Sequence, residues 1–336
     1  MSYIPRSGAE ALMPEEFQRE IIENVPEMSA VMSLAKKAPN MSRSQRRMPV
    51  LSVLPMAYFI NAGKALIDAS DIQLKKTTRM LWENKYLDAE ELAVIVPIPE
   101  SVLEDSDYDI WAQVRPKLLE AFGLAFDQAV FYGINAPAIW PDPIVTTAMA
   151  ADNYVPLGAC GDLYDDIMGE GGVIAKVEED GFMVNGHVAA MVMRGKMRGL
   201  RERTIDPGGQ ISFSGVPIFK ALTKEGVQGK TSYELDGEQV LFPRNGSIDA
   251  SRSLMISGDW SQLIYAMRKD ITWKILTEAV IQDPDTNEIL YNLAQQDMIA
   301  IRAVMRLAWQ VPNPVNRLRP DEDERYPFAV LGPSGS

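Results

Sequence analysis

The feature that most constrains the fold is a long amphipathic stretch within residues 99–133. Its apolar residues recur at every fourth position, at Ile110, Val114, Leu118, Phe122, Phe126 and Val130. This spacing predicts an α-helix with one wide buried stripe. At about 1.5 Å per residue, some 26 residues form a rod roughly 39 Å long. The rest of the chain is therefore expected to pack along this helix, which should end at Gly133.

Both the start and the interior of this helix carry local signals. Ser106 or Asp107 can cap the first turn, and Asp107 and Asp109 place negative charge at the positive end of the helix dipole. Pro116 lies inside the helix and lacks the backbone N–H that an internal hydrogen bond needs. We therefore expect a bend or a break near Gln113.

Composition limits the classes of function. The chain has 336 residues, 46 acidic and 33 basic, and a formal net charge of -13. A sequence-reading nucleic-acid binder needs clustered Lys and Arg, so this balance argues against one, although it allows a container for nucleic acid. A single cysteine, Cys160, excludes an internal disulfide framework and fits a reducing compartment. We expect no secretory signal and no membrane-spanning segment.

The first 49 residues predict two short helices and a linker. Residues 14–25 have a helical apolar spacing, and a second short helix is expected at residues 29–37. The linker that follows shows neither periodicity nor core residues. Its arginines, Arg43, Arg46 and Arg47, belong either to a solvated linker or to an arm that lies on a neighbouring subunit.

Residues 50–96 predict a two-stranded ribbon with a polar tip. A strand at residues 50–60 contains Pro55, which restricts it to an edge or a bulge, and residues 79–96 can supply the returning strand. The tip, residues 61–78, has no core of its own. A two-stranded ribbon alone in water is marginally stable, so we expect its contacts to come from other subunits.

The second half of the chain alternates between helical and extended patterns. After a Pro- and Gly-rich crossing at 140–161, we expect a helix with a glycine-rich centre at 162–179, a strand at 182–184 and a helix at 187–202. This alternation favours an α/β lobe with a central sheet. Paired strands are expected after residue 262.

The C-terminal pattern predicts one long strand and then a tail. Residues 298–311 alternate between apolar and polar positions, which is typical of a half-buried strand with Arg302, Arg306 and Gln310 on the polar face. The segment 321–336 is rich in Pro, Gly and charge and is expected to be a flexible tail.

Candidate catalytic and metal-binding motifs are weak. His187 is the only histidine and lies near no nucleophile motif, so we interpret it as a packing or capping residue. The acidic run at 283–287 imitates a calcium loop, but Glu288 stands where glycine is required, so a hairpin turn is favoured. Residues 226–231 imitate a phosphate loop without its helix. Glu104 and Asp105 could serve a hydrolase, although helix-end electrostatics explains them more simply.

Several short motifs together resemble the major capsid proteins of tailed bacteriophages. The run ELAVIVPIPESVLEDSDYDIW leads into the long helix, which ends in a D-x-A-x-x-x-G signature at Asp127, Ala129 and Gly133. The run Val216-Pro217-Ile218-Phe219 resembles the family's G-x-P-V strand. The turn at 257–260 resembles a GD-aromatic motif, and IRAVMRLAWQVPNP resembles the family's closing strand. The resemblance covers roughly residues 45–320.

This resemblance implies an α+β fold with five parts. They are an N-terminal arm (1–45), an extended β-hairpin loop (46–98), a peripheral domain with the long helix (99–150 and 265–305), an α/β axial domain (151–264 and 306–320) and the tail (321–336). The resemblance also implies a structural protein without catalytic, cofactor or metal sites. It would be made in the host cytoplasm and form pentamers and hexamers in the icosahedral head of a virion.

The implied partners are identical subunits, a portal, a separate scaffolding protein and, in some members, a decoration protein. The shell would enclose double-stranded DNA without reading its sequence. Some family members join a loop lysine covalently to an asparagine of a neighbour, and Asn313 or Asn316 could take that place here, but noncovalent contacts are the default. A nanocompartment of the encapsulin type is the nearest alternative function, and an acidic cytoplasmic hydrolase is a more distant one. The expected assembly contacts are Arg43, Arg46, Arg47, Lys64, Lys75, Lys76 and Asn316.

Overall fold

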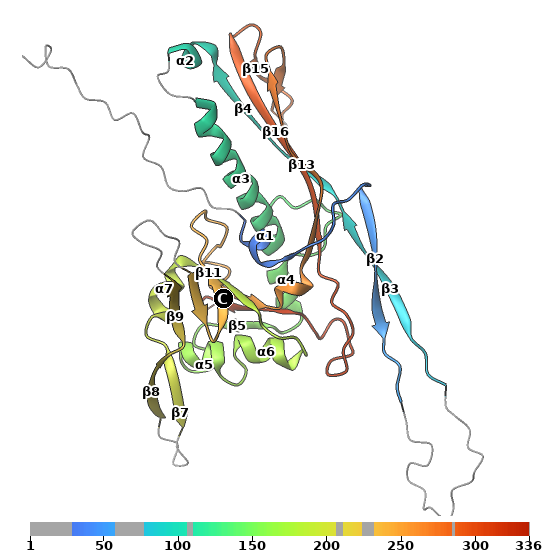
Figure 1. Cartoon of the computed structure of the whole chain (residues 1–336), viewed down its shortest axis with the longest axis vertical. Helices are drawn as coiled ribbons and strands as arrows, with labels where there is room; N and C mark the ends of the chain where they lie inside the picture. The colour runs from blue at the N-terminus through green and yellow to red at the C-terminus, as the bar shows by residue number, and fades with distance from the viewer. Residues whose placement is uncertain are drawn as a thin grey trace, which may run out of the picture.

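The computed structural model describes residues 29–57, 77–105, 110–205, 211–223, 232–283 and 286–335. Two lobes lie one above the other in Figure 1, and a two-stranded ribbon projects beside them. The expected helix at 14–25, the caps Ser106 and Asp107, residues 61–76 of the ribbon tip and the segment 226–231 that imitates a phosphate loop lie outside the described residues.

The long helix is α3, Ile110–Tyr132, and it continues through Pro116. No break occurs near Gln113. An internal proline costs about 3 kcal/mol, whereas each large apolar side chain that is fully buried contributes about 1.5–3 kcal/mol. Four members of the predicted stripe are buried, so packing outweighs the proline. The helix ends at Gly133, which has φ +70 and donates its N–H to the Ala129 carbonyl at 3.0 Å. The buried members are Leu118, Phe122, Phe126 and Val130.

A four-stranded sheet packs one face against α3. Its strand order is β1-β13-β16-β4, with β13, β16 and β4 antiparallel and β1 added parallel to β13 at the edge. Side chains from neighbouring strands, such as Val94, Trp273 and Ala303, meet the phenylalanines of α3 in one core. The predicted long strand at 298–311 is confirmed as β16. The strand bounds are β1 Lys36–Lys37, β13 Ile264–Leu276, β16 Met298–Gln310 and β4 Glu90–Pro99.

Two expected boundaries are wrong in this sheet. Strand β4 pairs with β16 along its whole length, so residues 90–98 belong to the sheet and not to the extended loop assigned to 46–98. Strand β16 runs unbroken to Gln310, so residues 306–310 are part of the same sheet rather than of an axial segment. The chain passes from β3, which pairs with β2, to β4, which pairs with β16, across the single residue Ala89, so the sequence carries no marked signal of this boundary.

The second lobe contains a seven-stranded mixed sheet in the order β5-β17-β12-β6-β11-β10-β9. Helices α5 (Leu163–Met168), α6 (Val173–Glu179) and α7 (Met191–Met197) contribute to a core that includes Ile167 and Met193. The predicted α/β character is therefore present. The strand bounds are β5 Tyr154–Pro156, β6 Gly186–Ala189, β9 Phe219–Thr223, β10 Ser232–Leu235, β11 Glu238–Leu241, β12 Met255–Gly258 and β17 Phe328–Gly332.

Several local predictions in this lobe are wrong. The expected helix at 187–202 is divided into strand β6, helix α7 and the start of β7, and the expected strand at 182–184 is irregular. The helix expected at 162–179 is two helices, because Gly169 and Gly172 pass so close to Asp165 that any side chain there would collide with it. A short strand such as β6 is buried on both faces and therefore lacks the alternation of exposed and buried residues that marks a strand in the sequence.

The expected flexible tail is also wrong. Strand β17 lies inside the seven-stranded sheet, antiparallel to β12 and parallel to β5. Phe328 and Leu331 have no exposed surface. The apolar run is only five residues long and follows a strongly charged segment, which made its burial difficult to predict.

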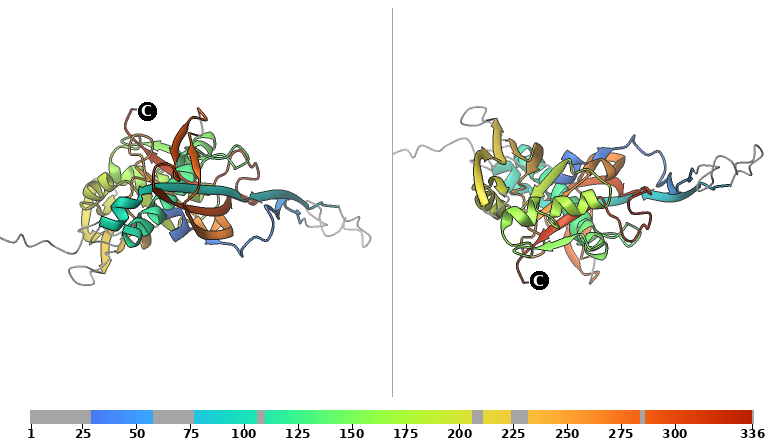
Figure 2. Two further views of the ribbon diagram at one scale, coloured as in Figure 1. Left: turned by 90° about the horizontal axis from the view of Figure 1, so that it is seen from above. Right: turned by 90° about the horizontal axis from the view of Figure 1, so that it is seen from below.

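The ribbon consists of β2, Gln45–Val53, and β3, Leu81–Asp88, in antiparallel register. Both views of Figure 2 show it extending away from the lobes. The linker before the ribbon was predicted to contain no core residue, and this is wrong, because Met41 is buried against Leu87. The remaining elements are α1 Ala30–Leu34, α2 Glu100–Asp105, α4 Ile144–Ala150, β7 Arg201–Ile205, β8 Ile211–Pro217, η4 Trp260–Gln262, β14 Val280–Gln282 and β15 Ile289–Asn292.

Candidate assembly surfaces

The projecting ribbon exposes large apolar side chains. Trp82 is 61% exposed, Leu81 43% and Tyr86 42%, although all three belong to a regular strand. Burying such a residue contributes about 1.5–3 kcal/mol, so a strand that leaves several in water indicates a surface that a partner covers. Among the described residues no third strand pairs with the ribbon, and the rest of the subunit joins it only through contacts such as the hydrogen bond from the Val315 N–H to the Leu51 carbonyl.

The base of the ribbon is fixed by the segment that precedes β17. The Lys85 Nζ atom lies 2.5 Å from Glu322 Oε1, and Arg317 donates to the Pro55 carbonyl at 2.6 Å. The Val315 N–H donates to the Leu51 carbonyl at 3.1 Å. These three contacts cross from the body to the ribbon, so they set the direction in which the ribbon leaves the subunit.

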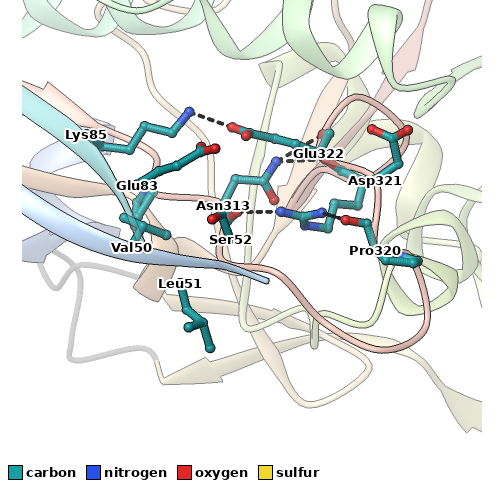
Figure 3. Close-up of a pocket in the computed structure, with 11 residues that line it drawn as sticks. Val50, Leu51, Ser52, Glu83, Lys85, Asn313, Pro320, Asp321 and Glu322 are labelled. Atoms are coloured by element: carbon teal, nitrogen blue, oxygen red, sulfur yellow. Dashed lines mark hydrogen bonds and ion pairs between the residues drawn. The ribbon is translucent and has the colours of Figure 1, made fainter. Parts of the chain in front are cut away.

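A small cavity of about 180 Å³ lies between the ribbon and this segment. Figure 3 shows Glu83 and Lys85 of β3 on one side and Asn313, Asp321 and Glu322 on the other. The guanidinium of Arg325, which is 3% exposed, donates to four backbone carbonyls of the segment and holds it in a closed turn. The Lys85–Glu322 ion pair and the buried Arg325 therefore connect the ribbon to the body of the subunit here, and we call this region the joint.

A second exposed apolar group lies on a hairpin at the far end of the four-stranded sheet. Strands β14 and β15 pair with each other, and their turn is closed by a hydrogen bond of 2.9 Å from the Asp283 N–H to the Glu288 carbonyl. The predicted hairpin turn is therefore confirmed. Ile289 is 64% exposed. The other exposed apolar side chains near it are Ile275, Val280, Leu290 and Tyr291.

A buried carboxylate attaches the end of the N-terminal arm to α3. Asp127 accepts hydrogen bonds from the Ser29 hydroxyl, from the Ala30 N–H at 2.8 Å and from the Val31 N–H at 3.2 Å. It thus satisfies the free N–H groups at the start of α1. Burial raises the pKa of Asp127 from 3.8 to about 6, and the hydrogen bonds from the arm oppose that rise. The sequence showed Asp127 only as part of a motif, without its partner.

The structure places some of the expected assembly contacts. Arg46 donates to the carbonyls of Pro39 and Asn40 in its own chain, whereas Arg43 and Arg47 are exposed. The Asn316 amide donates to the Asp180 carbonyl at 2.6 Å. Lys64, Lys75 and Lys76 lie outside the described residues. The structure does not bring the described four together, and their role in assembly stays a prediction.

Candidate catalytic residues form no recognisable site. His187 lies inside β6 with its Nδ1 2.8 Å from the Ser257 hydroxyl, and burial lowers its pKa to about 4. It therefore packs in a sheet rather than at a helix start. Glu104 and Asp105 lie in α2.

In the part of the chain that the structure describes, no three metal-binding side chains come together, and no helix has the length and apolar character needed to cross a membrane.

Sequence reasoning missed the apolar side chains on the ribbon and on the distal hairpin. Both strands of each hairpin carry β-forming residues, so the sequence showed that they were strands. It did not show which face had no covering layer, because that depends on where the other elements pack.

Comparisons with known proteins agree with these observations. The family model described as "Phage capsid family" matches residues 9–316. The chain is 26% identical over 300 residues to the "Major capsid protein" of Staphylococcus phage 80alpha, which covers 88% of this chain and 80% of that protein. A solved chain from Microbacterium phage Oxtober96 is 32% identical, with a TM-score of 0.77 over 99% of this chain and 100% of the other.

Two further solved structures share the fold. A chain from Mycobacterium phage Adephagia is 24% identical, with a TM-score of 0.76 over 100% of this chain and 99% of the other. A chain from "Capsid of native GTA particle computed with C5 symmetry" is 17% identical, with a TM-score of 0.61 over 99% of this chain and 100% of the other. Because the family model covers most of the sequence, the chain belongs to the phage capsid family and is a structural protein of the phage capsid shell.

Proposed function

We propose that this chain assembles with identical copies into pentamers and hexamers, which form an icosahedral head around double-stranded DNA. The observation that carries this proposal is the projecting β2–β3 ribbon, which leaves Trp82 and Leu81 exposed and pairs with no third strand among the described residues. A two-stranded ribbon is marginally stable alone, so its partners are expected to come from other subunits. Contacts at several places on one subunit reinforce one another through effective concentration.

The two lobes supply the proposed domains of the shell subunit. The four-stranded sheet and α3 form the peripheral domain, and the seven-stranded sheet with α5, α6 and α7 forms the axial domain. The N-terminal arm, assigned to residues 1–45, and the ribbon are the two parts proposed to contact neighbours. Arg43, Arg47 and the lysines of the ribbon tip are proposed contacts on those neighbours.

The proposed partners outside the shell are a portal, a separate scaffolding protein and a decoration protein. The subunits would assemble in the host cytoplasm and remain in the virion. We propose no catalytic step for the chain. An enzyme that used Glu104 and Asp105 would lose turnover when both are replaced by Ala, whereas a shell protein should at most lose some stability or assembly.

Deletion of the ribbon tip tests this proposal. Replacing residues 61–78 by a short Gly-Ser turn should leave a folded, soluble subunit, because the tip contributes to no described core. The same variant should assemble poorly, since the ribbon then cannot reach a neighbour. Negative-stain electron microscopy of the purified variant and the unmodified chain measures the difference.

A control variant separates the tip from general damage to the loop. A Gly-Ser segment of the original length should also impair assembly if specific tip contacts matter, while circular dichroism should show the same folded content in all three proteins. Shells of normal number and size from the shortened variant would contradict the role assigned to the ribbon.

A further inference from the structure

The outer face of the four-stranded sheet carries an unusual arrangement of charge. Along β16, Ala303, Met305 and Leu307 point into the core against α3, so Arg302 and Arg306 point away from it. Their cross-strand partners on β13 are also basic, because Lys274 pairs with Arg302 and Lys269 pairs with Arg306. We call these four residues the basic face.

Like charges directly opposite each other on a sheet destabilise it. Two such pairs stand on one face of a chain whose net charge is -13. Arg306 is paired with Glu91 across the next strand at 2.5 Å. Within the described residues, Lys269, Lys274 and Arg302 form no ion pair, and Lys274 and Arg302 are exposed. Glu91 compensates the Lys269–Arg306 pair in part, whereas the exposed Lys274–Arg302 pair has no counter-charge among the described residues, which indicates an anionic partner.

The chain itself carries a matching anionic group. Residues 321–324 are the only run of four consecutive acidic residues in the sequence. Glu322 is paired with Lys85 in the joint at the base of the ribbon, but Asp323 and Glu324 are exposed, and among the described residues neither forms an ion pair. The adjacent Arg325 does not neutralise them, because its guanidinium is directed at backbone carbonyls.

We propose that the basic face of one subunit binds the acidic run 321–324 of a second copy. No described ion pair joins the two groups within one chain, so the contact is assigned between copies. One surface meets a different surface, which makes the contact head-to-tail and suited to closed rings. Nucleic acid is disfavoured as the partner because the basic face holds only four cations, one of them paired with Glu91, on a chain with a net charge of -13. The inference rests on the proposed assembly into a shell.

Charge reversal on each side tests this contact. The face variant carries Lys274→Glu and Arg302→Glu, which leaves the Arg306–Glu91 pair intact, and the run variant carries Asp323→Lys and Glu324→Lys, which leaves the Lys85–Glu322 pair intact. Each alone should yield about tenfold fewer sedimenting particles at low salt, because like charges then meet at the interface. A chain that carries both reversals should assemble again in rings of any size, since its acidic face then meets the basic run of the next copy.

The control variant carries Lys196→Glu and Arg198→Glu, two exposed positions at α7 with the same change of charge as the face variant. It should assemble like the unmodified chain, and thermal unfolding should show that all variants are folded. Normal assembly of either single-sided variant, or failure of the chain with both reversals to recover assembly, would overturn the proposed contact. A face variant that forms normal shells lacking DNA would assign the face to nucleic acid instead.

If the unmodified chain, expressed in the same way as the variants, forms no particles, the proposed assembly into a shell is wrong. If the unmodified chain and the charge-reversed variants form particles equally well, only the proposed contact is wrong.

Discussion

At the scale of single residues, Asp127 makes the stability of the subunit depend on pH. Its folded-state pKa of about 6 lies above the usual 3.8, so the folded protein holds a proton that the unfolded chain has released. Its stabilising contribution is therefore complete below pH 4 and is lost as the pH rises through 6. The difference corresponds to roughly 3 kcal/mol. In the variant Asp127→Asn, position 127 no longer titrates, so denaturant titrations at pH 4 and at pH 7 should show that its contribution to the pH dependence of the free energy of unfolding is gone.

His187 provides the matched comparison, because its pKa is lowered in the folded protein and the resulting change of stability with pH has the opposite sign. Burial lowers its pKa from 6.5 to about 4, so the unfolded chain binds the proton first and stability falls as the pH falls through this range. His187→Gln should therefore be less sensitive to acid than the unmodified protein, and Asp127→Asn more sensitive. Equal pH profiles for the two variants would contradict this account.

At the scale of elements, the last strand decides whether the axial lobe folds. Strand β17 is buried and occupies an interior position in its sheet, with β12 on one side and β5 on the other. Deleting residues 326–336 should therefore give an insoluble or unfolded chain, because two strands lose their partner and Phe328 leaves the core. Deleting only residues 333–336 removes no strand and should be tolerated. Soluble expression and circular dichroism measure both outcomes.

The contrast between α3 and β17 explains how much of the fold could be predicted. A helix of 23 residues repeats its apolar spacing many times, and β16 alternates over 13 residues, so both were predicted from the sequence. Strands β6 and β17 are four and five residues long and fully buried, so neither shows a period. Their place in the sheet depends on contacts between distant segments, which one sequence does not reveal.

The candidate surfaces were predicted in part for a related reason. The ribbon was located because a polar tip between two strand-forming segments is visible locally. The joint at its base was not, since Lys85 and Glu322 are 237 positions apart. The basic face depends on the register between β13 and β16, which the order of residues does not fix.

At the scale of the whole molecule, the isolated subunit leaves apolar surface on the ribbon exposed, and we expect neighbouring subunits to cover it on assembly. Trp82 reports this state because it is 61% exposed in the isolated chain, whereas Trp260 and Trp309 are each 1% exposed. Assembly that covers the ribbon should transfer Trp82 from water to an apolar contact and shift the tryptophan emission of the protein to shorter wavelength. Trp82→Phe should lose most of that shift, while Trp273→Phe, at a position packed against the core within the subunit, should retain it. An equal shift in both variants would mean that the covered surface lies elsewhere and that the ribbon stays in solvent in the assembled shell.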